Sequence, residues 1–220
     1  MDEKEIKQIF YRDGYRLALQ HLEVEVTTSN LKAAVMELYA AMDGLLEVFV
    51  QRSETEGRSV ACRKGCAWCC HQEVFAVTHE QLFIQEFVEK HSSESERSLF
   101  IDRAREKSVQ TLNRPLDEQL KVRIPCPFLV DGACAVYEAR PMACRIYLSA
   151  SEKGCRREHD QPDNQKRFPD LFEFPLQAGR MLNEGFVACL KQIGLPSTEL
   201  PLEQGYASVV TLGQTFKSWI

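Results

Sequence analysis

The chain has 220 residues, of which 27 are Lys or Arg and 32 are Asp or Glu, so its formal net charge is −5. It is 44% hydrophobic and 27% charged, a composition that is typical of a globular protein and excludes disorder and collagen-like repeats. The acidic excess argues against a surface devoted to nucleic acid. The unusual number in this composition is nine cysteines.

The N-terminal decapeptide MDEKEIKQIF is charged from its second residue and has no apolar run, so we expect neither a secretion signal nor a transit peptide. The most apolar stretch, residues 31–50, contains Lys32, Glu37, Asp43 and Glu47, which argue against a membrane span. We therefore expect a cytoplasmic protein. In a reducing cytoplasm, clustered cysteines usually hold metal or perform redox chemistry rather than form structural disulfides.

Two amphipathic helices are predicted near the N-terminus. Residues 2–21 carry apolar side chains at helical spacing, which predicts a short helix. Residues 31–50 form a longer apolar stripe in steps of three and four, with Ser29 or Asn30 as the capping residue. The stripe predicts packing on the first helix and the core. The alternative is a protein partner or a homodimer that forms through the 31–50 helix.

Two more helices are predicted after the first cysteines. Thr78 with Gln81, and Ser93 with Glu96, have the spacing of capping boxes, in which the first side chain and the fourth each satisfy a free backbone N–H. We expect these two helices to form a helical hairpin that ends near residue 112.

The only clear β signal is the segment CPFLVDGACAVY at residues 126–137, in which Asp-Gly joins two short apolar runs. A polar stretch follows at residues 151–167. Helical spacing returns at residues 176–193, and a last helix is expected to start near Pro201.

We therefore predict a mainly α fold in which helices flank a cysteine-rich, irregular metal-binding core with one small β-hairpin. The expected parts are N-terminal helices (1–58), the cysteine core (59–160) and C-terminal helices (161–220), all in one compact domain.

Eight of the nine cysteines lie in two groups along the sequence. The early group is Cys62, Cys66, Cys69 and Cys70, and the late group is Cys126, Cys134, Cys144 and Cys155. Closely spaced thiolates repel one another and a bound cation removes that repulsion, so we predict that all eight are ligands of zinc or iron. Eight sulfurs can fill two four-coordinate sites, or hold one iron–sulfur cluster with sulfurs to spare. Cys189 lies on the apolar face of a predicted helix and is expected in the core.

The residues around the cysteines refine this prediction. Adjacent Cys69 and Cys70 should point in different directions and therefore not serve one metal equally. Residues 121–157 carry seven basic and three acidic side chains. We expect this local positive charge to offset the thiolates, with an anionic ligand or an RNA contact as the alternative. His71 or His79 can replace a sulfur as a ligand.

Three motifs together share the pattern of a known family. They are Cys62-x3-Cys66-x2-Cys69-Cys70, then Cys126-Pro127-Phe128-Leu129, and finally Cys134-x2-Tyr137-x2-Arg140-Pro141-x2-Cys144-Arg145. This constellation resembles the YkgJ-type (CxxCxxCC) cysteine-cluster family, although the first gap here has three residues. The resemblance implies a zinc- or iron-chelating domain of bacterial cytoplasmic proteins. Flagellin lysine N-methylases look like relatives with the same type of cluster, which suggests iron–sulfur chemistry.

Four other side chains are expected to surround the metal. Trp68 should shield it from water, Tyr137 and Arg140 should share one side, and Arg145 should lie beside a ligand. The predicted function is chelation of zinc or iron, including an iron–sulfur cluster. One alternative is an iron–sulfur-dependent enzyme of redox or methyl-transfer chemistry, in which no catalytic residue is identified. The other is an RNA- or protein-binding module with structural zinc.

Overall fold

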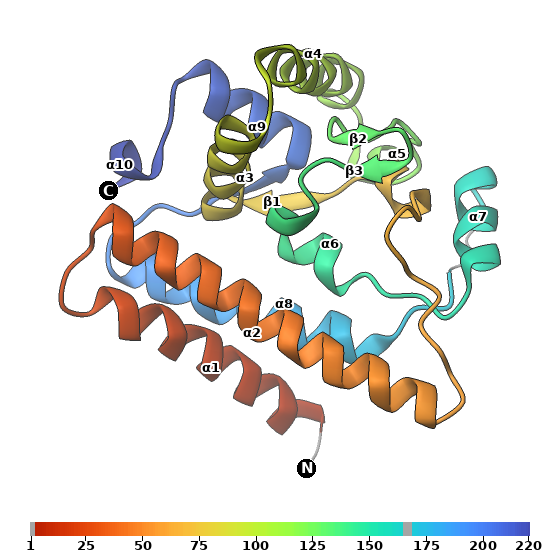
Figure 1. Cartoon of the computed structure of the whole chain (residues 1–220), viewed down its shortest axis with the longest axis horizontal. Coiled ribbons are helices and arrows are strands. Elements are labelled where there is room, and N and C mark those ends of the chain that lie inside the picture. Colours follow the sequence, from red (N-terminus) through yellow and green to blue (C-terminus); the bar gives the residue numbers. More distant parts are fainter. Residues whose placement is uncertain (1–2, 165–168) are drawn as a thin grey trace.

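The computed structural model describes residues 3–164 and 169–220, and this part of the chain is mainly helical, as predicted. Three long helices lie together on one side of the molecule: α1 (Glu3–Leu22), α2 (Thr28–Thr55) and α8 (Glu173–Gln192) (Figure 1). The cysteine segments and the shorter helices lie on the other side. No helix among the described residues has both the length and the apolar character that a membrane crossing requires.

The first two predicted helices are confirmed, and α2 is longer than expected. Its N-cap is Thr27, not Ser29 or Asn30, because the Thr27 hydroxyl accepts the Asn30 N–H at 3.1 Å. The apolar stripe of α2 is buried inside the chain, against α1 and α8. This agrees with core packing, which leaves little of the stripe for a second protein. Residue 2, the expected start of the first helix, lies outside the described residues.

Helices α1 and α8 cross at very short range because glycines stand where they touch. A Cβ on Gly14 would lie 1.9 Å from the carbonyl oxygen of Leu182, and a Cβ on Gly185 would lie 1.9 Å from that of Tyr11. Any larger residue would push the helices apart. The apolar side chains packed around this crossing, including Cys189 as predicted, form the larger of two hydrophobic cores.

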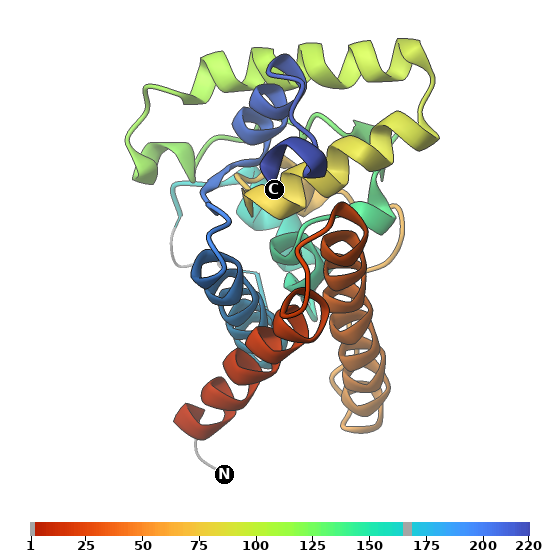
Figure 2. The ribbon, with the colours of Figure 1, turned by 90° about the vertical axis from the view of Figure 1, so that its left-hand side faces the viewer.

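The second core lies under α3 (Thr78–His91), α4 (Glu94–Thr111) and α9 (Leu202–Thr211). α9 begins directly after Pro201, as expected. The predicted helical hairpin of α3 and α4 is wrong: the two helices diverge from their junction and α9 packs against both (Figure 2). The sequence pattern predicted that the apolar faces of α3 and α4 pack on each other. They pack instead on α9, which lies about a hundred residues later in the sequence.

One of the two predicted capping boxes is confirmed. Ser93 accepts the Glu96 N–H, and the Glu96 carboxylate accepts the Ser93 N–H at 2.8 Å. The box of Thr78 with Gln81 is wrong. The Thr78 hydroxyl accepts the Thr198 N–H at 3.0 Å instead, and the residue that accepts the Val77 N–H is Glu80.

The predicted β-hairpin is confirmed as β2 (Leu129–Val130) and β3 (Ala133–Cys134), with Leu129 opposite Cys134. Asp131 and Gly132 both have positive φ, which fits the tight turn expected for Asp-Gly. A second antiparallel pair, β1 (Phe75–Val77) with β4 (Glu199–Pro201), was not predicted, because three-residue strands so far apart carry no local signal.

Six short helices complete the described part. They are η1 (Trp68–His71), α5 (Leu116–Gln119), η2 (Tyr137–Ala139), α6 (Met142–Ile146), α7 (Glu152–Asp160) and α10 (Phe216–Trp219). α7 occupies most of the polar stretch of residues 151–167, whose last three residues are not among those described. It begins at Ser151, whose hydroxyl accepts the Gly154 N–H at 3.0 Å.

Candidate metal centre

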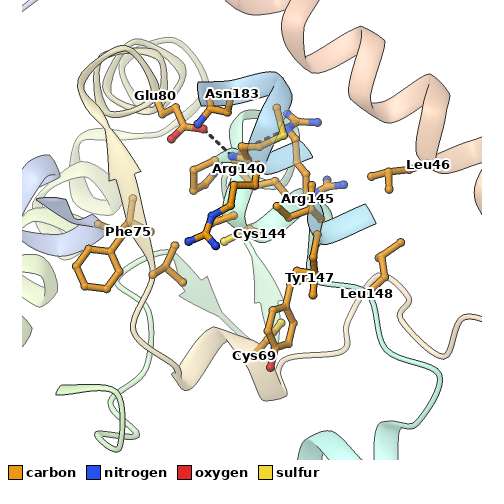
Figure 3. A pocket seen from close by; sticks show the side chains of 18 of the residues that line it. Leu46, Cys69, Phe75, Glu80, Arg140, Cys144, Arg145, Tyr147, Leu148 and Asn183 are labelled. Carbon is orange, nitrogen blue, oxygen red and sulfur yellow. Dashed lines mark hydrogen bonds between the residues drawn. The ribbon is translucent and has the colours of Figure 1, made fainter. Parts of the chain in front are cut away.

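Seven of the eight clustered cysteines line one cavity of about 1280 Å³. They are Cys62, Cys66, Cys69, Cys70, Cys126, Cys134 and Cys144. Figure 3 shows Cys69 and Cys144 in this cavity, with the ring of Tyr147 beside Cys69. The eighth, Cys155, is buried on α7 next to it. All of the clustered cysteines have free thiols, so the structure contains no disulfide among them.

Backbone hydrogen bonds hold the cysteine segments together. The Cys126 N–H donates to the Cys70 carbonyl at 2.7 Å, and the Ala61 N–H donates to the Ser149 carbonyl at 2.8 Å. Ser149 in turn donates its own N–H to the sulfur of Cys62 at 3.2 Å. Early and late cysteines therefore meet through main-chain contacts that do not depend on the sulfurs.

Charge interactions group the eight sulfurs into two sets of four, which Cys69 links because it also interacts with Cys70, Cys134 and Cys144. The first sulfur group is Cys62, Cys66, Cys69 and Cys155. The second sulfur group is Cys70, Cys126, Cys134 and Cys144.

In the first sulfur group, every member interacts with the other three. Burial, together with the charges of the other three members, raises the pKa of the Cys62 thiol to about 11, against the opposing hydrogen bond from Ser149. Burial likewise raises the pKa of Cys155, and the charges of Cys66 and Cys69 add to that effect. The Ser149 hydroxyl lowers the pKa of Cys155, so one serine contacts two members of the group.

The second sulfur group lies deeper in the protein. Burial, with a smaller contribution from the charge of Cys134, raises the pKa of Cys126 to about 12. Burial also raises the pKa of Cys144, with added contributions from Cys126 and Cys134. Cys70 joins this group through the charges of Cys126 and Cys144.

Cys69 is the residue that connects the two groups. The Cys70 thiol donates a hydrogen bond to its sulfur, which lowers the pKa of Cys69 and raises that of Cys70. The charge of Cys69 also raises the pKa of Cys134 and of Cys144. The two adjacent cysteines thus differ in their neighbours, and Cys69 is the thiol that ionises first.

The donor set fits zinc or iron by its chemistry, because soft thiolates in sets of four are the ligands that both metals take in proteins. The sulfurs are near enough for their charges to interact, but no three His, Cys, Asp or Glu side chains among the described residues are close enough to bind one ion directly. Binding therefore requires the sulfurs to move inward, which the cavity between them permits.

Three of the four side chains expected around the metal, Tyr137, Arg140 and Arg145, line the cavity with the cysteines, whereas Trp68 does not. Burial raises the pKa of Cys134, and the charge of Arg140 opposes that shift; the Arg140 guanidinium stacks on the ring of Tyr137 at 3.9 Å. Trp68 has its ring against His159, and its backbone N–H opposes the increase in the pKa of Cys66 that burial causes.

Arg145 lines the cavity and also has a structural role. It is 2% exposed, pairs with the carboxylate of Asp43, and donates to the carbonyls of Glu138 and Arg140. Its guanidinium lies 4.0 Å from the centre of the Tyr39 ring. Arg145 thus fixes the helix that carries Cys144.

The expected surplus of positive charge is largely neutralised by acids from outside the 121–157 segment. Arg123 pairs with Glu158 at 2.5 Å, and Lys121 pairs with Asp163 at 3.5 Å. His79 also differs from expectation. It is fully buried against Phe186 and does not line the cavity with the cysteines.

We did not predict from the sequence the buried cluster of Lys107, Glu73 and Glu203 next to Cys126. The Lys107 ammonium lies 3.3 Å from Glu203 and 3.7 Å from Glu73, and both Lys107 and Glu203 affect the pKa of Cys126. The sequence does indicate this cluster, because Lys107 lies in a helical stripe whose other members are small or apolar residues such as Phe100. A lysine in that position needs buried partners.

Comparison with known families agrees with this geometry. Residues 61–167, just under half of the chain, match the family model CxxCxxCC, described as "Putative zinc- or iron-chelating domain". The match covers every cysteine of both sulfur groups. No curated protein matches the chain, and no solved structure matches it either. The helices α1, α2, α8 and α9 lie outside the matched segment; α1, α2 and α8 pack together on one side of the molecule, and α9 packs on α3 and α4.

Proposed function

We propose that this protein chelates zinc or iron through eight cysteine thiolates, with one four-coordinate site in each sulfur group. The observation that carries the proposal is the convergence of seven cysteines on one cavity, with Cys155 buried next to it. The charge interactions among the sulfurs support their division into two sets. Like charges held this close favour a cation strongly, and in structural zinc sites metal binding supplies on the order of 10–16 kcal/mol.

The two sites differ in their surroundings. The first sulfur group receives hydrogen bonds from Ser149 and lies under the short helix α7. The second has Arg140 and the ammonium of Lys107 near it, and these charges offset the negative charge of the thiolates. A reducing compartment such as the cytoplasm would keep both sets of thiols available.

Metal analysis of two matched variants tests this proposal. Cys155→Ser removes a ligand from the first group and Cys134→Ser removes one from the second, whereas Cys189→Ala changes a core cysteine. We expect about two ions per chain in the natural protein and in Cys189→Ala, and about one in each of the other variants. Loss of all metal from both single variants would instead indicate one shared cluster. A metal-free natural protein with unchanged stability would refute chelation.

An iron–sulfur-dependent enzyme is the second candidate. It is favoured by the extent of the cavity, which continues past the sulfurs to Leu46 on α2 and Asn183 on α8 (Figure 3). Coordination alone does not need this space. Protein purified without oxygen distinguishes the two candidates: visible absorption with acid-labile sulfide indicates a cluster, and colourless protein that contains zinc indicates chelation only.

A further inference from the structure

Two histidines meet at the edge of the first sulfur group. His71 ends η1, the helix that also carries Cys69 and Cys70, and His159 lies on α7, one turn after Cys155. α7 packs on η1, and the centres of the two imidazole rings are 4.8 Å apart at an interplanar angle of 78°. The packing of α7 on η1 therefore brings two imidazoles together beside Cys69 and Cys155, the two members of the first sulfur group that these elements carry.

The hydrogen bonds of each ring determine which nitrogen is free. His71 Nδ1 lies 3.0 Å from the carbonyl oxygen of Ala67, and His159 Nδ1 lies 3.0 Å from the Asp160 carboxylate. Carbonyl and carboxylate oxygens only accept, so each Nδ1 carries the proton and each Nε2 presents its lone pair. This is the arrangement by which proteins orient a histidine toward a metal ion.

Solvent can reach this pair. The His159 side chain is 24% exposed and His71 is half-buried, whereas Cys155 is only 7% exposed. Among the described residues, neither Nε2 has a hydrogen-bond partner. The two imidazoles are thus more accessible to solvent than the side chain of Cys155.

We propose that His71 and His159 form an entry site that first binds a borderline divalent cation such as Zn²⁺ and then passes it to the first sulfur group. This inference rests on the proposed chelating function. Metal–nitrogen bonds of about 2.0–2.1 Å require the two Nε2 atoms to lie within about 4 Å of each other, which rings at this separation meet by side-chain rotation.

Two imidazoles and water bind such a cation more weakly than four thiolates do, so the ion moves on rather than remaining at the entry site. The nearby positive charge does not block entry. Arg156 lies over the ring of Trp68, and its guanidinium pairs with Asp160 at 3.5 Å. Asp160 therefore offsets Arg156 while it also orients His159.

Trp68 reports on the entry site, because its ring lies 5.4 Å from that of His159. The chain has two tryptophans, so a Trp219→Phe background makes Trp68 the sole tryptophan emitter. Rapid mixing with Co²⁺ then follows Trp68 fluorescence together with sulfur-to-cobalt absorption. We expect the fluorescence to change before the thiolate absorption rises.

The matched variants replace imidazole by a phenyl ring of similar shape. His71→Phe with His159→Phe should slow loading about tenfold and abolish the early fluorescence phase, with the final metal content unchanged. His91→Phe, on the exposed end of α3, should load like the natural sequence.

Equal loading rates in all proteins, or thiolate absorption that never lags fluorescence in the natural sequence, would overturn the entry site alone. A lower final metal content in the double variant, with circular dichroism unchanged, would overturn it by making the histidines permanent ligands. A natural sequence that takes up no metal would overturn the chelating function and the entry site together.

Discussion

Cys126 donates its backbone N–H to the carbonyl oxygen of Cys70 at 2.7 Å. The two residues are far apart in sequence and belong to the same sulfur group, so a main-chain hydrogen bond already joins the segments whose sulfurs are proposed to share one ion. This contact is independent of metal, but it lies in irregular backbone with little regular secondary structure around it. Its persistence therefore depends on what the neighbouring sulfurs bind.

Metal removal is expected to loosen these segments and leave the long helices intact. Amide hydrogen exchange after treatment with a chelator should quicken at least about tenfold at residues 61–72 and 126–135, which corresponds to about 1.4 kcal/mol of local stability. Amides in the middle of α8 belong to a separate core and serve as the internal control. Equal acceleration in both regions would mean that the metal stabilises the whole protein rather than the cysteine segments.

We expect the buried contacts of Arg145 to contribute strongly to the stability of the fold. Arg145→Lys keeps the charge, but one ammonium does not reach Asp43, Glu138 and Arg140 with the planar geometry of a guanidinium. We expect a loss of about 2–3 kcal/mol in the free energy of unfolding, measured by urea denaturation. Arg180→Lys is the control, because Arg180 is exposed and its pair with Glu184 is long, at 3.8 Å. A similar small change in both variants would contradict a structural role for Arg145.

Local sequence signals identified the parts of the fold that depend on neighbouring residues. The box of Ser93 with Glu96, the Asp-Gly turn at residue 131 and the apolar stripe of α2 are all readable over a few positions, and the structure contains each of them. The capping box predicted for Thr78 with Gln81 does not form because of a tertiary contact: the Thr78 hydroxyl accepts the backbone N–H of Thr198.

Contacts between distant segments account for what the sequence did not reveal. The pairing of Phe75 with Pro201, and the ion pair of Arg145 with Asp43, join residues more than a hundred positions apart. The sulfur groups illustrate the same limit. Cys155 belongs to the late cysteines by sequence, but the packing of α7 on η1 brings it to Cys66 and Cys69. Spacing identified which residues are ligand candidates, and tertiary structure determines which of them share a group.

Because α1 and α8 cross so closely, we expect one added methyl group at the crossing to lower the free energy of unfolding strongly. In Gly185→Ala the new Cβ would collide with the carbonyl of Tyr11, so the helices must separate and the free energy of unfolding should fall by about 1–3 kcal/mol. Gly44→Ala is the matched control on α2, because nothing lies within 4 Å of its Cβ position. It should leave stability unchanged or raise it by up to about 1 kcal/mol. Thermal denaturation of both proteins checks the difference, and equal melting temperatures would contradict the close crossing.

Acid stability should depend on His79. Burial lowers the pKa of its imidazole to about 3, and Asn183 opposes this shift. In the unfolded chain a histidine titrates near about 6.5, so between these values the unfolded state binds a proton that the folded state does not. Stability from this group is therefore complete above about pH 6.5 and falls by about 1.4 kcal/mol per pH unit down to about pH 3.

His79→Phe should remove that slope, because a phenyl ring fits beside Phe186 and has no proton to bind. Urea denaturation at a series of pH values gives the slope for each protein. Acid also protonates the thiolates and releases metal, but it does so equally in His91→Phe, where an exposed histidine of the same helix is replaced. The difference between the two variants thus isolates the buried imidazole. Parallel pH curves for both would show that His79 is protonated in the folded protein, and the buried, neutral ring described for this position would be wrong.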